Sequence, residues 1–536
     1  MRDARPRGFW LGMQSAYLFE AKGIQRWVLE GGRLRDIAAA SALLTGAARS
    51  SEDDTLAAVL AQTRFSPRFS RRAGGAFMLH FEHDQAPAFE RFRMLWRLAF
   101  MQRLPGLEFT EGYAEHPNDP LAAREAAYIG KARRWWSGRE NSMAGLAPFG
   151  HALTILAQRT GRPAAEVTGP GERIDPITQA KRAADDLHNQ VGDMMKTGAT
   201  WPDRMDGDSL GEGVPFPFNG REPRIAVVHA DISALGRFYE AVGEVAKGRD
   251  RALEICLAAS TAIEDAVKDA AQRACEDALS KDSGAMPARP VLIGGDDITI
   301  ILRDDVALPF VSAFLGALEK ATQDRLTTFA TTYDLRDTPG IAVGLTAGAG
   351  IAFGGPKQPF FRLLELAESL CSYAKTRGKQ LTEGGAMPPS VVAFYRVTES
   401  AVADSAGDLF NDRLKSSWGH LSNQPYGLGE ETRPSLPRLD ALKELRQAMD
   451  SEALAVGSLR SLKSLLLQEK RDEAQQVWSR WRKMAGKRSK PALDEFDKAL
   501  GNLTGKSAGD LERLFDAKEE DGITSLFDAL EWRAVA

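Results

Sequence analysis

The chain has 536 residues, several times the size of one typical domain, so we expect more than one hydrophobic core. Charged residues make up 26% and the formal net charge is -4, which excludes a protein that is drawn to nucleic acid by its overall charge. Three dispersed cysteines argue against disulfides and a zinc knuckle, and no apolar run is long enough to span a bilayer or act as a secretory leader. We therefore expect a cytoplasmic protein without a membrane contact.

The first part of the chain begins with a β-α pattern. Residues 10–20 predict a strand that leads into a short helix at 24–29, and a second helix follows around 35–45. Two glycines within residues 71–81 predict a tight hairpin turn followed by an apolar strand. A helix is expected at 87–102.

The middle of the chain differs from both of its neighbours. Residues 119–219 are predicted to be mostly helical, with Gly/Pro-rich stretches at 168–176 and 206–223. The second stretch indicates a linker to the next unit.

The second half repeats the order of the first. A compact apolar strand at 223–230 ends in Asp231, and a Gly-Gly-Asp-Asp turn interrupts the apolar segment 290–302. The other elements expected here are helical residues up to about 279, a helix at 306–327, a strand at 340–351 and an amphipathic helix at 361–377.

The order strand, helix, helix, hairpin, helix, strand is that of a ferredoxin-like unit, and two copies explain both halves. The first copy has Gly74-Gly75-Ala76-Phe77 where the second has Gly294-Gly295-Asp296-Asp297. Residues 437–535 have the apolar spacing of a helical bundle. The predicted class is α+β multidomain. Its domains are a first ferredoxin-like unit (1–118), a helical insert (119–219), a second ferredoxin-like unit (220–395) and an all-α C-terminal bundle (396–536).

Three acidic residues stand where strands end or turn. Asp231 directly follows a buried strand, and Asp296 and Asp297 occupy the hairpin turn. If the hairpin pairs beside the first strand, the three carboxylates come to one edge of the sheet. Nucleotidyl transfer needs such carboxylates, because they hold two divalent cations about 4 Å apart while a hydroxyl attacks a triphosphate in line. Mg²⁺ suits the site, since it prefers oxygen ligands.

Residues beside the acids are suited to phosphate. Gly294 and Gly295 let the backbone turn tightly and leave room for a ligand. A helix opens directly after Asp231 and offers backbone N–H groups to the β- and γ-phosphates. Lys375 is a candidate partner of the γ-phosphate, and a solvated lysine near a helix end is an equally good interpretation. The residues at the opening of the helix are Ser233, Ala234, Leu235 and Gly236.

These motifs resemble the large polymerase/cyclase subunit of type III CRISPR effector complexes, the Cas-ten family. Residues 231–236 (DISALG) are similar to a strand end of the family's second palm domain, 294–297 to its GGDD turn, and 366–378 (LAESLCSYAKTRG) to a helix shared with GGDEF-type cyclases. Residues 24–28 (IQRWV) and 32–41 (GRLRDIAAAS) are similar to its first-palm signature. The order of palm, helical insert, palm and helical C-terminus covers nearly the whole chain.

The resemblance implies an enzyme that converts ATP into 3′–5′ cyclic oligoadenylates when an assembled complex with guide RNA binds target RNA. It implies other type III CRISPR effector subunits as partners, Mg²⁺ or Mn²⁺ as cofactor, and triphosphate binding by Lys375. Ser41 and its neighbours in the first palm would help to seat the acceptor ATP, and this GGAF palm would bind nucleotide without metal. The implied metal ligands are Asp231, Ile232, Asp296 and Asp297.

The chain departs from the family pattern in three ways. The first palm starts almost at once and His83-Asp84 is a lone pair, so we expect no HD nuclease domain. Ala157 and Thr160 stand where a zinc motif would have cysteines, so we expect an insert without zinc. The chain is also short for the family. Two alternatives to the implied function therefore stay open. One is a stand-alone cyclase that makes another cyclic nucleotide, and the other is an RNA-guided scaffold subunit with a vestigial nucleotide site.

Two segments combine basic and aromatic residues, 131–136 (KARRWW) and 470–490. Such segments can bind RNA. In the second segment, however, Trp478 and Trp481 are spaced as in a helix, and we expect them to pack into the bundle with the basic residues on its solvated face.

Overall fold

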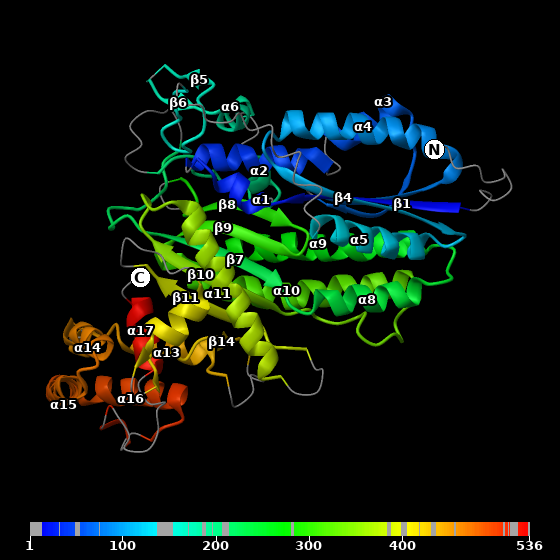
Figure 1. Cartoon of the computed structure of the whole chain (residues 1–536). Helices are drawn as coiled ribbons and strands as arrows, with labels where there is room; N and C mark the ends of the chain where they lie inside the picture. Colours follow the sequence, from blue (N-terminus) through cyan, green and yellow to red (C-terminus); the bar gives the residue numbers. More distant parts are fainter. Residues whose placement is uncertain are drawn as a thin grey trace.

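Figure 1 shows the computed structural model of the chain, in which the first unit (blue) lies beside the second (green) and the C-terminal helices (orange to red) gather at one end. The structure describes residues 13–31, 33–48, 54–73, 75–136, 154–169, 171–184, 189–195, 197–205, 214–279, 284–382, 387–397, 405–416, 419–429, 436–454, 457–507, 510–512, 514 and 524–533. Residues 10–12, Gly32, Gly74 and 206–213, which carry parts of the predictions above, lie outside these ranges.

The first unit is a four-stranded antiparallel sheet in the order β2-β3-β1-β4. Its strands are β1 (Met13–Lys22), β2 (Arg68–Ala73), β3 (Ala76–Glu82) and β4 (Glu108–Pro117). Its helices are α1 (Ile24–Leu29), α2 (Leu34–Ala48), α3 (Thr55–Thr63), α4 (Ala86–Arg103) and α5 (Pro120–Trp136).

The two faces of this sheet are covered by different helices because successive side chains of a strand point to opposite faces. Phe19 of β1 and Phe77 of β3 stack at 5.4 Å and meet Trp96 of α4 edge-on, so α4 covers an aromatic face. On the other face, Leu18 of β1 and Met78 of β3 form a separate apolar cluster with Ala123 and Ala127 of α5.

The second unit repeats the arrangement around β7 and extends it. The sheet has the order β14-β11-β10-β7-β9-β8. Its strands are β7 (Ile225–Ile232), β8 (Ala288–Gly294), β9 (Asp297–Arg303), β10 (Ala347–Gly354), β11 (Val391–Arg396) and β14 (Tyr426–Gly427). Its helices are α8 (Leu235–Ala246), α9 (Ala252–Ala278), α10 (Asp304–Thr332) and α11 (Phe360–Gln380).

The two sheets share one order of connection. In each, the first strand lies between the last strand and the second hairpin strand, which gives β2-β3-β1-β4 and β8-β9-β7-β10. This is the strand order of a ferredoxin-like unit. The predicted α+β class is confirmed.

In its described residues, the insert is less helical than the sequence predicts. Its first helix, α5, packs on β1 and β4 of the first sheet rather than on the insert. The other described elements are short: β5 (Glu166–Val167), β6 (Arg173–Ile174), α6 (Pro176–Ala183) and α7 (Gln190–Asp193). The many Gly, Pro and Thr residues of this segment favour turns over helix, which explains the difference.

The C-terminal part is dominated by helices after two short strands. Its elements are α12 (Ala406–Asp408), β12 (Lys415–Ser416), β13 (Gly419–His420), α13 (Leu439–Ala448), α14 (Gly457–Leu467), α15 (Arg471–Arg488), α16 (Lys490–Thr504) and α17 (Thr524–Arg533). Trp478 and Trp481 are buried, with ring centroids 5.3 Å apart, so they pack into the bundle as expected.

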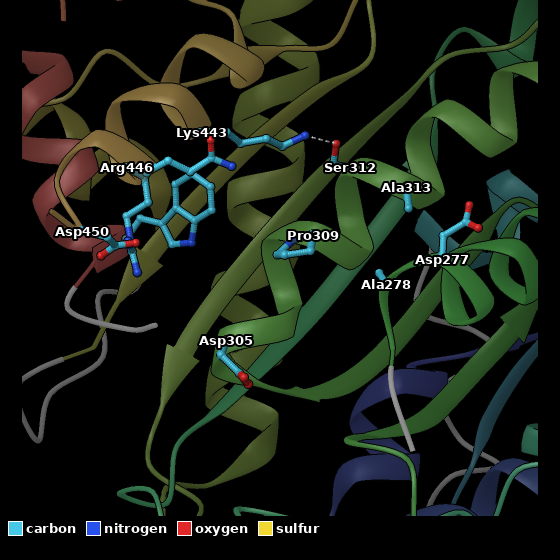
Figure 2. A pocket seen from close by; sticks show the side chains of 11 residues that line it. Asp277, Ala278, Asp305, Pro309, Ser312, Ala313, Lys443, Arg446 and Asp450 are labelled. Atoms are coloured by element: carbon cyan, nitrogen blue, oxygen red, sulfur yellow. Dashed lines mark hydrogen bonds and ion pairs between the residues drawn. The ribbon is translucent and has the colours of Figure 1, made fainter. Parts of the chain in front are cut away.

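The helical end docks on the second unit through polar contacts. A cavity of about 540 Å³ lies between α10 and α13 at this seam (Figure 2). Lys443 reaches across it to donate to the Ser312 hydroxyl at 2.7 Å. Nearby, the buried Asp528 of α17 accepts hydrogen bonds from the Tyr426 hydroxyl at 2.8 Å and the Asn423 backbone N–H at 2.9 Å.

Asp528 makes the docking of α17 sensitive to pH. Burial raises the pKa of its carboxyl from 3.8 to about 6 in spite of the hydrogen bonds it accepts. The folded state therefore holds the proton more tightly than the unfolded state, and this contribution is lost as pH rises through about 6. As the pH rises from 4 to 6, the free energy of unfolding of the wild type should fall relative to that of Asp528→Asn, by at most about 1.4 kcal/mol per pH unit. Urea unfolding of both proteins across this range measures the difference, and parallel pH profiles would contradict the prediction.

Candidate functional site

Two of the predicted acids face each other across neighbouring strands. Asp231 of β7 and Asp297 of β9 are direct partners in the antiparallel register. Residues paired in this way point to the same face, with Cβ atoms about 5 Å apart. Gly348 of β10 and Gly294 of β8 continue the same row on either side. The two carboxylates are therefore flanked in this row by glycines, which carry no side chain.

Lys375 of α11 packs over this row of strand residues. Its ammonium contacts the Asp231 carboxylate and donates to the Ile232 carbonyl at 2.9 Å. A Cβ atom added to Gly348 would lie 2.3 Å from Lys375 Cγ, so the glycine makes space for the lysine stem. Lys375 thus pairs with a predicted metal ligand.

Asp296 precedes Asp297 in the turn and borders a different cavity. Its backbone carbonyl accepts from the Ile232 N–H at 3.2 Å, and its side chain borders a cavity that Asp297 does not reach. Gly295 adopts a φ of +68°, a conformation that favours glycine and lets the chain reverse between the two acids.

The carboxyls of the turn repel one another. Burial raises the pKa of Asp297 to about 8, and the negative charges of Asp296 and Asp231 add to the effect. Burial and the charge of Asp231 also raise the pKa of Asp296 above its ordinary value. A cation placed at this turn would relieve the repulsion.

The large cavity next to Asp296 lies between the two units and has a volume of about 650 Å³. Arg71 of β2 and Arg124 of α5 both hydrogen-bond the phenol of Tyr128. Burial raises the pKa of Tyr128, but the charges of the two arginines outweigh burial and lower it overall. Cationic first-unit residues therefore face an acidic second-unit turn across one cavity. Sequence patterns did not indicate the two arginines, because they lie in different elements of the first unit.

A smaller cavity of about 160 Å³ borders Asp297 on the opposite side. Ile24 and Gln25 of α1 form one wall, and Leu292 and Ile293 of β8 form the other. The Gln25 amide lies 3.5 Å from an Asp297 carboxylate oxygen. Gln25 belongs to the IQRWV motif, but nothing in that motif indicates that it reaches the acidic turn.

The helix after Asp231 offers fewer donors than expected. The Ser233 N–H is bonded to the Thr346 carbonyl at 2.7 Å and its side chain is buried, so this residue is not available to a phosphate in this structure. Ala234 precedes α8 with a φ of +58°. Leu235 and Gly236, the first residues of α8, border the large cavity.

Ser41 does not reach either cavity. It is fully buried within α2, and its hydroxyl donates to the Ile37 carbonyl at 3.1 Å. Its neighbours Leu44 and Thr45 in the same helix border the small cavity, together with Gln25 of α1. An acceptor-side role for this part of α2 therefore stays a prediction, in which Thr45 rather than Ser41 reaches the cavity.

The alignment of the two hairpin turns also needs correction. In the first unit Glu20 pairs with Ala76, as Asp231 pairs with Asp297 in the second. Gly75 and Ala76 therefore stand at the positions of the two turn acids, whereas Phe77 is a core residue. A shift of one residue moves side chains to the opposite face, so only the pairing register decides the alignment.

This register reveals a counterpart of the Asp231–Lys375 pair. Glu20 occupies the position of Asp231, and it forms an ion pair with Lys131 of α5, the helix that covers the first sheet as α11 covers the second. Lys131 is thus part of this ion pair rather than a free basic residue of the KARRWW segment. The side chains of residues 133–136 lie outside the described part of the structure.

The donor atoms at the acidic turn fit a hard divalent cation without forming a complete cage. Among the residues that the structure describes, no three His, Cys, Asp or Glu side chains are gathered closely enough to hold a metal ion. The Asp231 carboxylate and the Ile232 carbonyl nevertheless converge on one cation, the Lys375 ammonium. These are oxygen ligands of the kind that Mg²⁺ prefers, and substrate phosphates and water commonly complete its shell.

The fold and the acidic row define a tandem α+β protein in which one unit carries paired carboxylates in the middle of its sheet. Neither a protein-family model nor a curated protein matches the chain. Solved structures do match. The chain is similar to the Csm1–Csm4 cassette in complex with pppApApA, with a TM-score of 0.50 and 13% identity, over 97% of this chain and 69% of the matched chain.

Two further matches have a TM-score of 0.49, 14% identity and coverage of 97% of this chain and 70% of the matched chain. They are the Csm1–Csm4 cassette in complex with cA4 and the Csm1–Csm4 subcomplex in the type III-A CRISPR-Csm interference complex. At the level of the fold, the match at 0.50 confirms the resemblance that the motifs indicate. Among the helices that the structure describes, none has the length and apolarity that crossing a membrane requires.

Proposed function

We propose that the chain is a Cas-ten-type subunit of a type III CRISPR effector complex and that it joins ATP into cyclic oligoadenylates when the complex binds target RNA. The observation that carries the proposal is the pairing of Asp231 with Asp297 beside two cavities that meet at the acidic turn. The neighbour that holds pppApApA supports an adenylate as substrate.

The residues around the turn are proposed to bind the metal ions and the phosphates. Asp231, Asp297 and the Ile232 carbonyl would hold Mg²⁺ or Mn²⁺, with Asp296 approaching from the large cavity. When bound, the cations would neutralise the charge on the triphosphate and on the attacking oxygen. With a cation held at Asp231, Lys375 would no longer pair with that carboxylate and would be free to bind phosphate.

The large cavity is proposed to take the triphosphate. The guanidinium groups of Arg71 and Arg124 offer fixed donors to phosphate oxygens, and the start of α8 at Leu235 and Gly236 adds backbone N–H groups. The small cavity beside Gln25 leads to the opposite face of the turn, from which the acceptor hydroxyl would approach. Two cavities on two sides of one turn suit an in-line displacement.

The experiment uses the purified complex with ATP, Mn²⁺ and target RNA. We expect phosphodiester-linked adenylates in mass spectra of the products, and none when target RNA is left out. Complete absence of such products, with the complex assembled and RNA bound, would reject the proposal.

A scaffold subunit with a vestigial site is the second candidate, and the ion pair of Lys375 with Asp231, which engages a predicted metal ligand, favours it. Thermal unfolding separates the two. An intact site should gain about 2.7 kcal/mol at an ATP concentration 100 times the Kd, with Mg²⁺ present. Arg71→Gln should remove most of this gain while leaving the melting temperature without ATP almost unchanged. Equal melting curves with and without ATP for the wild type would support the scaffold.

A further inference from the structure

The insert touches both walls of the small cavity beside Asp297. One wall belongs to α1 of the first unit, which carries Ile24 and Gln25, and the other belongs to β8 of the second. Helix α1 has only six residues, and so short a helix is not stable without outside contacts. What holds α1 in place therefore decides where Gln25 stands relative to Asp297.

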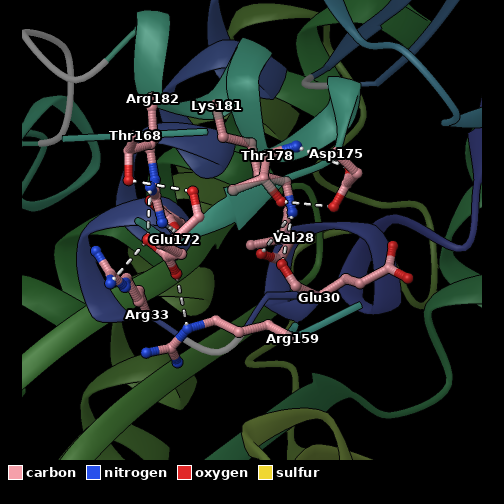
Figure 3. A network of polar contacts seen from close by, with 11 residues as sticks. Val28, Glu30, Arg33, Arg159, Thr168, Glu172, Asp175, Thr178, Lys181 and Arg182 are labelled. Atoms are coloured by element: carbon pink, nitrogen blue, oxygen red, sulfur yellow. Dashed lines mark hydrogen bonds and ion pairs between the residues drawn. The ribbon is translucent and has the colours of Figure 1, made fainter. Parts of the chain in front are cut away.

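Lys181 of α6 holds the C-terminal end of α1 (Figure 3). Its side chain is 1% exposed, and its ammonium donates to the backbone carbonyls of Trp27 and of Glu30, the latter at 2.9 Å. The same ammonium lies 4.8 Å from the centre of the Trp27 ring. Carbonyls at the end of a helix lack partners within the helix, and a cation there also interacts favourably with the helix dipole. Lys181 thus supplies the C-terminal cap of α1 from another part of the chain.

Helix α6 is itself anchored to the first unit. Asp175 caps its N-terminus by accepting from the Ile177 and Thr178 N–H groups at 2.9 and 3.1 Å. Arg182 forms a two-pronged ion pair with Asp36 of α2. It also donates to Glu172 at 2.9 Å (Figure 3). These contacts leave Lys181 little freedom to move away from α1.

The insert binds the other wall through Arg289 of β8. This buried arginine donates to the Asn189 side chain at 3.1 Å and to the Pro202 carbonyl at 3.3 Å. Trp201 of the same segment is buried and lies so close to Gly192 that an added Cβ atom would be 2.4 Å from its Nε1. One continuous segment therefore grips α1 at one end and β8 at the other.

We propose that the insert is a brace that sets the position of α1 against the acidic turn, and that Lys181 is the positioning residue through which it acts on Gln25 and Asp297. The assignment of a catalytic turn rests on the proposed function, whereas the bracing of α1 does not. Lys181 does not touch substrate. It keeps the small cavity at the width that the approach of an acceptor requires.

Hydrogen exchange tests the brace without any assay of activity. In Lys181→Met, amides of residues 24–29 and of 294–297 should exchange at least tenfold faster than in the wild type, while those of α15 stay unchanged. Thr178→Val is the matched control, since it removes the hydroxyl bond to Asp175 within α6 and leaves Lys181 in place. Lys181→Gln is made in parallel so that the test does not depend on the folding of one variant. Unchanged exchange at 24–29 in both Lys181 variants would overturn the inference.

Product formation tests the path from Lys181 to the turn. Lys181→Met should lower kcat about tenfold with a much smaller change in KM for ATP. Lys181→Arg should retain most of the wild-type kcat, and Thr178→Val should have the kcat and KM of the wild type. The double variant Lys181→Met/Gln25→Ala should be no slower than the slower single variant, because both changes act on one contact. If the fold-losses in kcat of the two single variants multiply in the double variant, Lys181 does not act through Gln25. A wild type without products, but with the expected exchange pattern, would reject the proposed function and leave the brace standing.

Discussion

Asp297→Asn should lower cyclic oligoadenylate formation about 1000-fold, which corresponds to about 4 kcal/mol of barrier. Asparagine keeps the shape of the side chain but cannot carry the negative charge that holds a cation. The same change should raise the melting temperature of the metal-free protein by about 2–4 °C, about 1 kcal/mol, because it removes a buried carboxyl that its neighbours repel. Asp296→Asn should act in the same direction.

Gain of stability with loss of activity is the signature of a site kept for function. Asp304→Asn is the control. Asp304 is buried, and burial raises its pKa to about 6. It stands at the end of β9 that is opposite Asp297. Its substitution should leave product formation unchanged. Full activity of both Asp297→Asn and Asp296→Asn, measured with saturating ATP and Mn²⁺, would show that the acidic turn does not hold the reacting metal.

Gly350→Ala should lower the melting temperature of the second unit by about 6–12 °C, equivalent to about 3 kcal/mol. A Cβ atom at this position of β10 would lie 1.9 Å from the Ala367 carbonyl oxygen and 2.5 Å from the Cys371 nitrogen. Both are backbone atoms of α11, so the whole helix must move away from the sheet. Because α11 carries Lys375, nucleotide binding should weaken as well.

The control for this prediction is Gly355→Ala, just beyond the end of β10. Nothing lies within 4 Å of a Cβ atom added there, and the change should shift the melting temperature by less than about 2 °C. Differential scanning calorimetry of the two variants measures the contrast. If Gly350→Ala has the same melting temperature as the wild type, the close contact of α11 with β10 is not required for stability.

Gly112 of the first unit makes the corresponding close approach. Its added Cβ atom would lie 2.1 Å from the Ala127 carbonyl oxygen of α5. Gly112 pairs with Leu18 as Gly350 pairs with His229, two residues before Glu20 and Asp231 respectively. The two units therefore share the covering helix and an acid–lysine pair in addition to their strand order. Only the second unit adds acids in the turn, which is why the proposed chemistry is confined to it.

The sequence by itself determined the class of the fold and the identity of the acidic turn. Period-two apolar runs and paired glycines mark the strands and hairpins, because these patterns follow from local backbone geometry. Asp231 and Asp297 could be expected to meet, since a strand end and a hairpin turn of one sheet come to the same edge. The insert was harder to predict, because its short elements are held by contacts distant in sequence, such as that of Lys181 with α1.

Only the tertiary structure decided what depends on register and on long-range packing. The pairing of Glu20 with Ala76 corrects the alignment of the two turns, and the burial of Ser41 leaves its neighbour Thr45 as the residue of α2 that borders the small cavity. Arg71, Arg124 and Gln25 join the site from three elements of the first unit. Their side chains gain a role only when two separately built sheets are packed together, and no local pattern encodes that packing.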